Sequence, residues 1–176
     1  AVLLQKAVEN PLLAPQRINL LYFLADARER NGETEAAIKV NEEARQAAPK
    51  FPLLDYQHAW IYYHSHDWEK AIVQMQNFIK KYPEQKERVY QVKMMLSNTY
   101  VQQGEIGKGE AVLEEMLADD PENPSINNDL GYLYADQGKN LEKAEKMIRI
   151  ALKSEPDNMA YLDSMGWVLF KLERYQ

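Results

Sequence analysis

The chain contains no cysteine. This absence excludes disulfide bonds, thiolate metal sites and thiol catalysis. It leaves the compartment open, because a helical chain without cysteine can fold in the cytoplasm or in the periplasm. Long hydrophobic runs are missing too, since no stretch approaches the roughly 18 apolar residues that a membrane-spanning helix needs. We therefore expect no membrane insertion by this chain.

Positive charge is scarce. The 176 residues include 21 Lys and Arg against 27 Asp and Glu, which gives a net charge of −6 and a pI of about 5.2. Nucleic acids and anionic membranes attract basic surfaces. The charge balance therefore argues against both as the main partner. Hydrophobic residues make up 45% of the chain, which is the composition of a folded protein rather than a disordered one.

Five of the eight prolines recur at nearly fixed intervals. The steps between them are 34, 34, 38 and 35 residues. A period near 34 that closes on proline is typical of stacked helix–turn–helix repeats. The longer step contains four extra residues, 86–89, which we expect to lengthen a helix or a turn between repeats. The prolines in question are Pro15, Pro49, Pro83, Pro121 and Pro156.

Each period contains two apolar stripes with a spacing of three and four residues, which is one face of a helix. In the first period the two stripes are separated by Gly32, which adopts a positive φ without penalty, and Pro49 ends the second helix. The predicted repeats are 18–51, 52–85, 90–123 and 124–158, with the end of a preceding repeat at 1–17 and a truncated repeat at 159–176. We expect a single array over 1–176, cut from a longer one.

The best-formed repeat carries the stretch 129–134, Asp-Leu-Gly-Tyr-Leu-Tyr, followed by Ala144, Ile148, Ala151 and Pro156. This pattern resembles the tetratricopeptide repeat (TPR) family, and the resemblance extends over residues 18–176. A second stretch, 161–167, is similar to a segment of bacterial TPR proteins. The departures are His58 where the family has Leu, Arg28 where it has Tyr, and Gly109 where it has Ala.

The resemblance implies an all-α fold, an α-solenoid wound into a right-handed superhelix, with a concave groove lined by the first helix of each repeat. Small residues such as Ala25, Ala59, Gly131 and Gly166 should let paired helices approach closely. Packing at native density makes the size of such residues matter. Replacement of Gly131 or Gly166 by Leu should therefore overpack the core, at a cost of roughly 1–3 kcal/mol.

The resemblance also implies which side chains face the groove. Tyr56, Trp60 and Tyr63 follow one another at spacings of four and three, so they share one helix face. Exposed aromatic rings with a polar rim are typical binding anchors. The alternative is that these rings only pack between neighbouring helices. Acidic groove positions, among them Asp26 and Asp163, would favour a basic or neutral ligand. The complete predicted groove set is Tyr22, Asp26, Tyr56, Trp60, Tyr63, His64, Met94, Asn98, Asn128, Tyr132 and Trp167.

No pattern indicates catalysis, a metal or a cofactor. The run 64–67, His-Ser-His-Asp, has two His that do not share a helix face, so it reads as a turn in which Asp67 caps a helix. The glycine-rich run 104–109 has the wrong spacing for a phosphate-binding loop and no Ser or Thr after its Lys. The family's carboxylate clamp is also missing, because Asn98 and Asn128 have no accompanying lysines.

The sequence therefore predicts a non-enzymatic scaffold that binds a peptide or protein segment in an aromatic-lined groove. One alternative is the targeting or adaptor arm of a larger enzyme. Another is self-association to a homo-oligomer through apolar ends of the array, around Met165, Leu169 and Leu172 at one end and residues 1–4 at the other.

Overall fold

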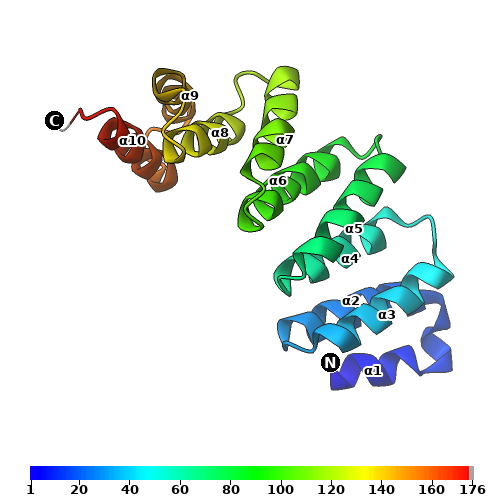
Figure 1. Cartoon of the computed structure of the whole chain (residues 1–176). Helices are drawn as coiled ribbons and strands as arrows, with labels where there is room; N and C mark the ends of the chain where they lie inside the picture. The colour runs from blue at the N-terminus through cyan, green and yellow to red at the C-terminus, as the bar shows by residue number, and fades with distance from the viewer. Residues whose placement is uncertain (175–176) are drawn as a thin grey trace. The chain divides into compact units, whose positions relative to one another are not determined.

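The computed structural model describes residues 1–174, and every regular element in that range is a helix (Figure 1). The predicted last repeat ends with Tyr175 and Gln176, which lie outside the described residues. In chain order the elements are α1 (Val2–Val8), the 3₁₀ helix η1 (Pro11–Gln16), α2 (Arg17–Arg30), α3 (Thr34–Ala47), α4 (Pro52–His64), α5 (Trp68–Lys81), α6 (Lys86–Gln102), α7 (Ile106–Asp119), α8 (Pro124–Asp136), α9 (Leu141–Ser154) and α10 (Met159–Lys171).

The chain divides into two compact units, Ala1–Thr99 and Tyr100–Gln176, and the division falls inside α6. The four residues 86–89, extra to the repeat period, form the first turn of α6. They therefore lengthen a helix rather than a turn. None of the helices in residues 1–174 combines the length and the apolar character that a bilayer span requires.

In the first unit, helical hairpins stack through small and branched residues. Leu21 of α2, Ala44 of α3 and Leu54 of α4 form one buried cluster, so three successive helices share a core. Further along, Met75 and Phe78 of α5 are also fully buried. Burial of one such large apolar side chain stabilises the fold by roughly 1.5–3 kcal/mol.

A buried chain of amide groups joins the same helices. The Asn41 side-chain amide of α3 donates to the Leu54 carbonyl (3.0 Å) and to Oε1 of Gln57 (2.9 Å). Gln57 in turn donates to the Tyr22 carbonyl of α2 (2.8 Å). Asn41 is fully buried and Gln57 nearly so. Because buried polar groups are costly unless they are paired, these bonds fix the register of α2, α3 and α4.

In the second unit, α8 and α9 form a close hairpin around Gly131. A Cβ atom at Gly131 would stand 3.0 Å from Cγ1 of Ile148 and 3.1 Å from the Ala144 carbonyl oxygen, so the predicted close approach is confirmed there. At Gly166 the prediction is wrong, because a Cβ atom would meet nothing within 4 Å. The reason is that α10 is the last helix among the described residues, so no following helix packs on Gly166 as α9 packs on Gly131.

The turns between paired helices require a left-handed residue. Gly32 has φ +76°, as the sequence predicts. The equivalent turn between α4 and α5 is formed by His66 with φ +60°, and its ring stacks on Trp68 at 4.7 Å. Asp67 caps α5 by accepting a hydrogen bond from the Lys70 backbone N–H, which confirms the predicted turn and cap.

Four of the five periodic prolines stand two residues beyond a helix end. They are Pro49, Pro83, Pro121 and Pro156, after α3, α5, α7 and α9. Pro15 differs, because it lies inside η1 rather than after a helix. The fixed φ of proline matches that of a 3₁₀ helix, so η1 tolerates it where a long α-helix would not.

Candidate functional site

The central feature of the first unit is a row of rings on α4, formed by Tyr56, Trp60, Tyr63 and His64, which we call the α4 ladder. The centroids of Tyr56 and Trp60 are 6.2 Å apart in a stacked arrangement, and those of Trp60 and Tyr63 are 6.3 Å apart. Trp60 and His64 lie closer, at 4.3 Å. Residues three and four apart are neighbours on a helix, so this contiguity follows directly from the sequence spacing.

The rings of the α4 ladder pack inward and remain open outward. Tyr56 contacts the buried Phe78 ring edge-on at 6.0 Å, and Tyr63 contacts Trp68 at 5.8 Å. Tyr56, Trp60 and Tyr63 are nevertheless half-buried rather than buried, and His64 is exposed. The sequence leaves two interpretations open, packing and surface display. Both apply, because each ring packs against the core and is still partly exposed.

Helix α2 flanks the α4 ladder with paired charges. Nδ1 of His64 lies 3.2 Å from Oε1 of Glu29, and Asp26 pairs with Arg30 at 3.0 Å. Tyr22, also predicted for the groove, is half-buried on the same helix, with its ring edge-on to Phe23 at 5.4 Å. Of the predicted acidic lining, Asp26 is therefore paired with a cation of this chain, and Glu29 contacts an imidazole.

Helix α6 flanks the α4 ladder through Asn98. The Tyr63 hydroxyl donates to Oδ1 of Asn98 at 3.1 Å, and the side chain of Asn98 is exposed. Met94, one turn earlier on α6, is half-buried. An aromatic face with an amide and a thioether beside it can contact a peptide by ring packing and by hydrogen bonds to its backbone.

The phenol of Tyr56 remains a hydrogen-bond donor over the physiological range. Burial raises its pKa above the ordinary value; the Arg88 charge opposes this shift and Tyr22 reinforces it. The hydroxyl of Tyr56 is thus held neutral at the edge of the ladder, where it can donate to an acceptor on a ligand.

Two of the three residues predicted in the second unit, Tyr132 and Trp167, share a patch, whereas the third, Asn128, is buried outside it. Tyr132 of α8 and Trp167 of α10 line one pocket of about 530 Å³ together with Leu162, Asp163, Gly166 and Phe170. The Trp167 ring stacks on Phe170 at 5.5 Å, and the Lys171 ammonium lies 4.8 Å from the Trp167 ring centroid. Asn128 is only 7% exposed, and its amide donates to Asp129 at 3.1 Å.

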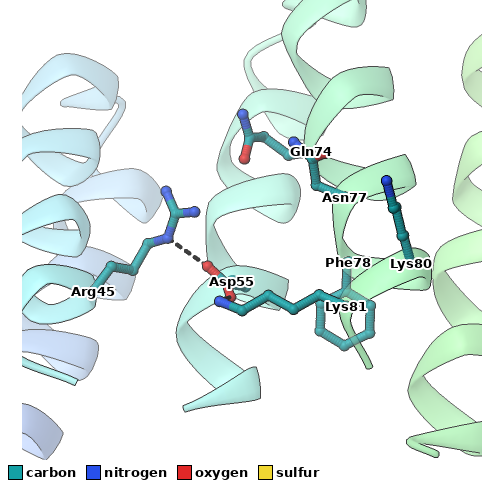
Figure 2. Close-up of a pocket in the computed structure, with 7 residues that line it drawn as sticks. All are labelled: Arg45, Asp55, Gln74, Asn77, Phe78, Lys80 and Lys81. Atoms are coloured by element: carbon teal, nitrogen blue, oxygen red, sulfur yellow. Dashed lines mark hydrogen bonds and ion pairs between the residues drawn. The ribbon is translucent and has the colours of Figure 1, made fainter. Parts of the chain in front are cut away.

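A pocket of the first unit was not predicted from the sequence. It has a volume of about 480 Å³ and lies among α3, α4 and α5 (Figure 2). Its lining residues are Arg45, Asp55, Gln74, Asn77, Phe78, Lys80 and Lys81. They come from three helices without a common period, so no spacing rule could have brought them together. The only local signal is the Lys80–Lys81 pair in the last turn of α5.

Asp55 is the most constrained charge in this pocket, with a side chain only 12% exposed. Nε of Arg45 lies 2.6 Å from its Oδ1, while Nζ of Lys81 and the Tyr82 hydroxyl each lie 2.7 Å from its Oδ2. Burial acts to raise the pKa of Asp55, but the hydrogen bonds from Lys81, Tyr82 and Arg45 together outweigh it and lower the pKa. The carboxylate therefore stays ionised and ties three helices together.

Within residues 1–174, no three His, Asp or Glu side chains come together in a way that could hold a metal ion. The nearest approach to an acid–base pair in the candidate site is Glu29 with His64, and this pair has no nucleophile beside it in any contact that the structure shows.

Comparison with known sequences identifies the class. Two sequence models, both described as tetratricopeptide repeat, match residues 54–84 and 100–166, and together they cover more than half of the chain. The chain belongs to the tetratricopeptide repeat family, so the predicted fold class, an all-α solenoid of helix–turn–helix repeats, is confirmed. The limits of the individual repeats stay a prediction.

A bacterial TPR repeat-containing protein is similar to this chain in sequence. The TPR repeat-containing protein PA4667 of Pseudomonas aeruginosa is 29% identical over 141 residues, which is 80% of this chain. The matched segment is 23% of that protein, so the chain spans about a quarter of the length of its relative.

Solved structures share the fold at low sequence identity. MamA (residues 41 to the end) from Desulfovibrio magneticus aligns with a TM-score of 0.73 at 18% identity, over 89% of this chain and 86% of that one. BtubC from P. vanneervenii aligns with a TM-score of 0.76 at 19% identity, over 98% and 81%. A tetratricopeptide repeat protein from Parabacteroides merdae aligns with a TM-score of 0.76 at 17% identity, over 97% of this chain and 65% of that one.

Proposed function

We propose that this protein is a non-enzymatic scaffold that binds a segment of a partner protein on the α4 ladder. The observation that supports this most strongly is the continuous row of half-exposed rings formed by Tyr56, Trp60, Tyr63 and His64. Large aromatic rings supply contact area at a low cost in side-chain entropy, and they dominate the energetics of many protein interfaces. Membership in a repeat family whose arrays present extended binding surfaces is consistent with this role.

The bound segment is expected to be neutral and partly apolar. Asp26 is paired with Arg30, and Glu29 lies against Nδ1 of His64, which offsets the carboxylate charge only when the imidazole is protonated, so these two contacts leave at most one negative charge on the α2 side of the ladder. The exposed amide of Asn98 and the neutral phenol of Tyr56 offer hydrogen bonds to a peptide backbone. Affinity would then come from packing of the rings against the bound segment, and the polar groups would fix the position of that segment along the ladder.

The test is a capture experiment with the native chain and with a triple variant, Tyr56→Ala, Trp60→Ala and Tyr63→Ala, on extract of the source organism. Removal of three anchors of this kind should weaken binding at least 100-fold, since one interface anchor contributes roughly 2 kcal/mol or more. Circular dichroism must first show that the variant keeps its helix content. The matched control is Val73→Ala, which shortens an exposed apolar side chain on α5 outside the ladder.

A partner that is retained by the native chain and by Val73→Ala, but lost by the triple variant, supports the ladder as the binding surface. Equal capture by all three chains contradicts it and leaves the rings as packing residues only.

Self-association is the second candidate, and it is favoured by the apolar patch of the second unit. Phe170 is 53% exposed and Leu162 45% exposed, beside Tyr132 and Trp167. Exposed apolar patches of this kind mark interaction sites. Light scattering at high protein concentration decides the matter: a monomer at all concentrations rejects self-association, and dimers that are lost on Phe170→Ser support it.

A role as the targeting arm of a larger enzyme is a further alternative, which activity assays on the whole parent protein would test.

A further inference from the structure

The pocket among α3, α4 and α5 has a charge opposite to that of the chain as a whole. Arg45, Lys80 and Lys81 line it against the single carboxylate of Asp55, whereas the whole chain carries a net charge of −6. Figure 2 shows Arg45 reaching toward Asp55 from one side, with Gln74, Asn77 and Lys80 on the opposite side. Local fields of this kind, rather than net charge, decide which group a surface pocket attracts.

Asp55 takes up only part of the hydrogen-bonding capacity of the cationic side chains in the pocket. Arg45 binds it through Nε, and its two terminal N–H₂ groups make no hydrogen bond to any described residue. Lys81 is occupied by Asp55 and by the Pro49 carbonyl at 2.8 Å. In contrast, the side chains of Gln74, Asn77 and Lys80 line the pocket without a hydrogen bond or ion pair among residues 1–174.

We propose that this pocket binds an acidic segment of a protein, with its acidic side chains received by the free arms of Arg45 and by Lys80. The same pocket already holds one carboxylate, since Asp55 is bound there by the other donors. Guanidinium and ammonium groups bind carboxylates through charge-assisted hydrogen bonds, which are about twice as strong as neutral ones.

The remaining groups fit a peptide better than a free inorganic anion. The amides of Gln74 and Asn77 each donate and accept hydrogen bonds, as a peptide backbone does, whereas an inorganic anion mainly accepts. The ring of Phe78 forms an apolar part of the lining. A volume of about 480 Å³ is enough for one side chain and the adjoining backbone.

This surface is distinct from the α4 ladder. The two share no residue and meet at one ring contact, between Phe78 of the pocket lining and Tyr56 of the ladder, edge-on at 6.0 Å. The pocket proposal therefore does not depend on the ladder, and either can fail while the other holds.

The experiment follows the side-chain N–H₂ signals of Gln74 and Asn77 and the Nε–H signal of Arg45 by NMR in the whole chain. The probes are a short Gly/Ser peptide with a central run of glutamates, its glutamine counterpart, and inorganic phosphate. The key variant is Lys80→Glu, which leaves the Asp55 ion pairs in place. The control is Lys153→Glu, an equal charge change at an exposed lysine of α9 in the other unit.

We expect the glutamate peptide, and not the glutamine peptide, to shift all three signals in a saturable and salt-sensitive way. Charge reversal at Lys80 should weaken binding roughly tenfold, because it removes one attraction and adds one repulsion, whereas Lys153→Glu should not. Three results would each overturn the proposal: equal shifts with the glutamine peptide, shifts with phosphate but not with glutamate, or unchanged affinity in Lys80→Glu.

Discussion

His58 makes the stability of the first unit depend on pH. Its side chain is only 3% exposed, its ring lies edge-on to Tyr62 at 5.0 Å, and its Nδ1 atom has no hydrogen-bond partner among the described residues. Burial, reinforced by the Arg45 charge and opposed by Asp55, lowers the pKa of His58 to about 4. Between about pH 4 and pH 6.5, the folded protein therefore keeps this imidazole neutral, whereas the same side chain in the unfolded chain is protonated.

The sign and the size of the effect follow from linkage. Above pH 6.5 both states are neutral and the full stability is present. As the pH falls from 6.5 to about 4, only the unfolded chain takes up the proton, so the folded state loses stability. With a folded pKa of about 4, the loss between pH 7 and pH 5 is roughly 2 kcal/mol, and it approaches roughly 3 kcal/mol below pH 4.

The assay compares the native chain with His58→Leu by urea unfolding at pH 7 and pH 5. All other titrating groups are common to both chains, so the difference between their pH dependences belongs to His58. The native chain should lose about 2 kcal/mol more than the variant. An NMR titration of the His58 ring gives the pKa directly. A folded pKa near 6.5, or equal pH dependence in the two chains, would refute the reasoning.

Two further predictions follow from the packing. Gly131→Leu should destabilise the chain by roughly 1–3 kcal/mol, because the new side chain meets Ile148, whereas Gly166→Leu should be neutral or slightly stabilising, because it enters open space and replaces glycine inside a helix. Thermal unfolding of the pair checks this, and equal destabilisation at both sites would contradict it. Asn41→Ala should cost roughly 1–3 kcal/mol, because Oε1 of Gln57 loses its buried donor. Chemical denaturation of Asn41→Ala, Gln57→Ala and the double variant should show a non-additive interaction, and simple additivity would count against the network.

The sequence predicted the parts of the fold that depend on period. The proline spacing and the apolar stripes reflect helix pairs that repeat, so the helices and their turns could be located without coordinates. Gly32 is an example, because a left-handed turn residue leaves a local signature. The prediction was wrong at Gly166, since close packing depends on the presence of a second helix and not on the glycine itself. It was wrong at Pro15 too, which η1 accommodates.

In the candidate sites, contacts within one helix could be predicted from the sequence, whereas contacts between helices could not. Tyr56, Trp60 and Tyr63 lie on one helix, so their contact could be predicted from spacing alone. The contact between Glu29 and His64 joins two helices and could not be predicted from spacing, although it places a carboxylate beside the ladder. The pocket among α3, α4 and α5 was not predicted for the same reason, because its lining residues come from three helices that only tertiary packing brings together.

The most direct test of the proposed function places a photo-crosslinking amino acid at Trp60 and, in a second chain, at Val73 on α5. Both chains are irradiated in extract of the source organism, and the crosslinked peptides are sequenced. The ladder account predicts adducts at position 60 with one defined segment of a partner, and few at position 73. Equal yields at both positions, or adducts at position 73 alone, would contradict the claim that the α4 ladder is the binding surface.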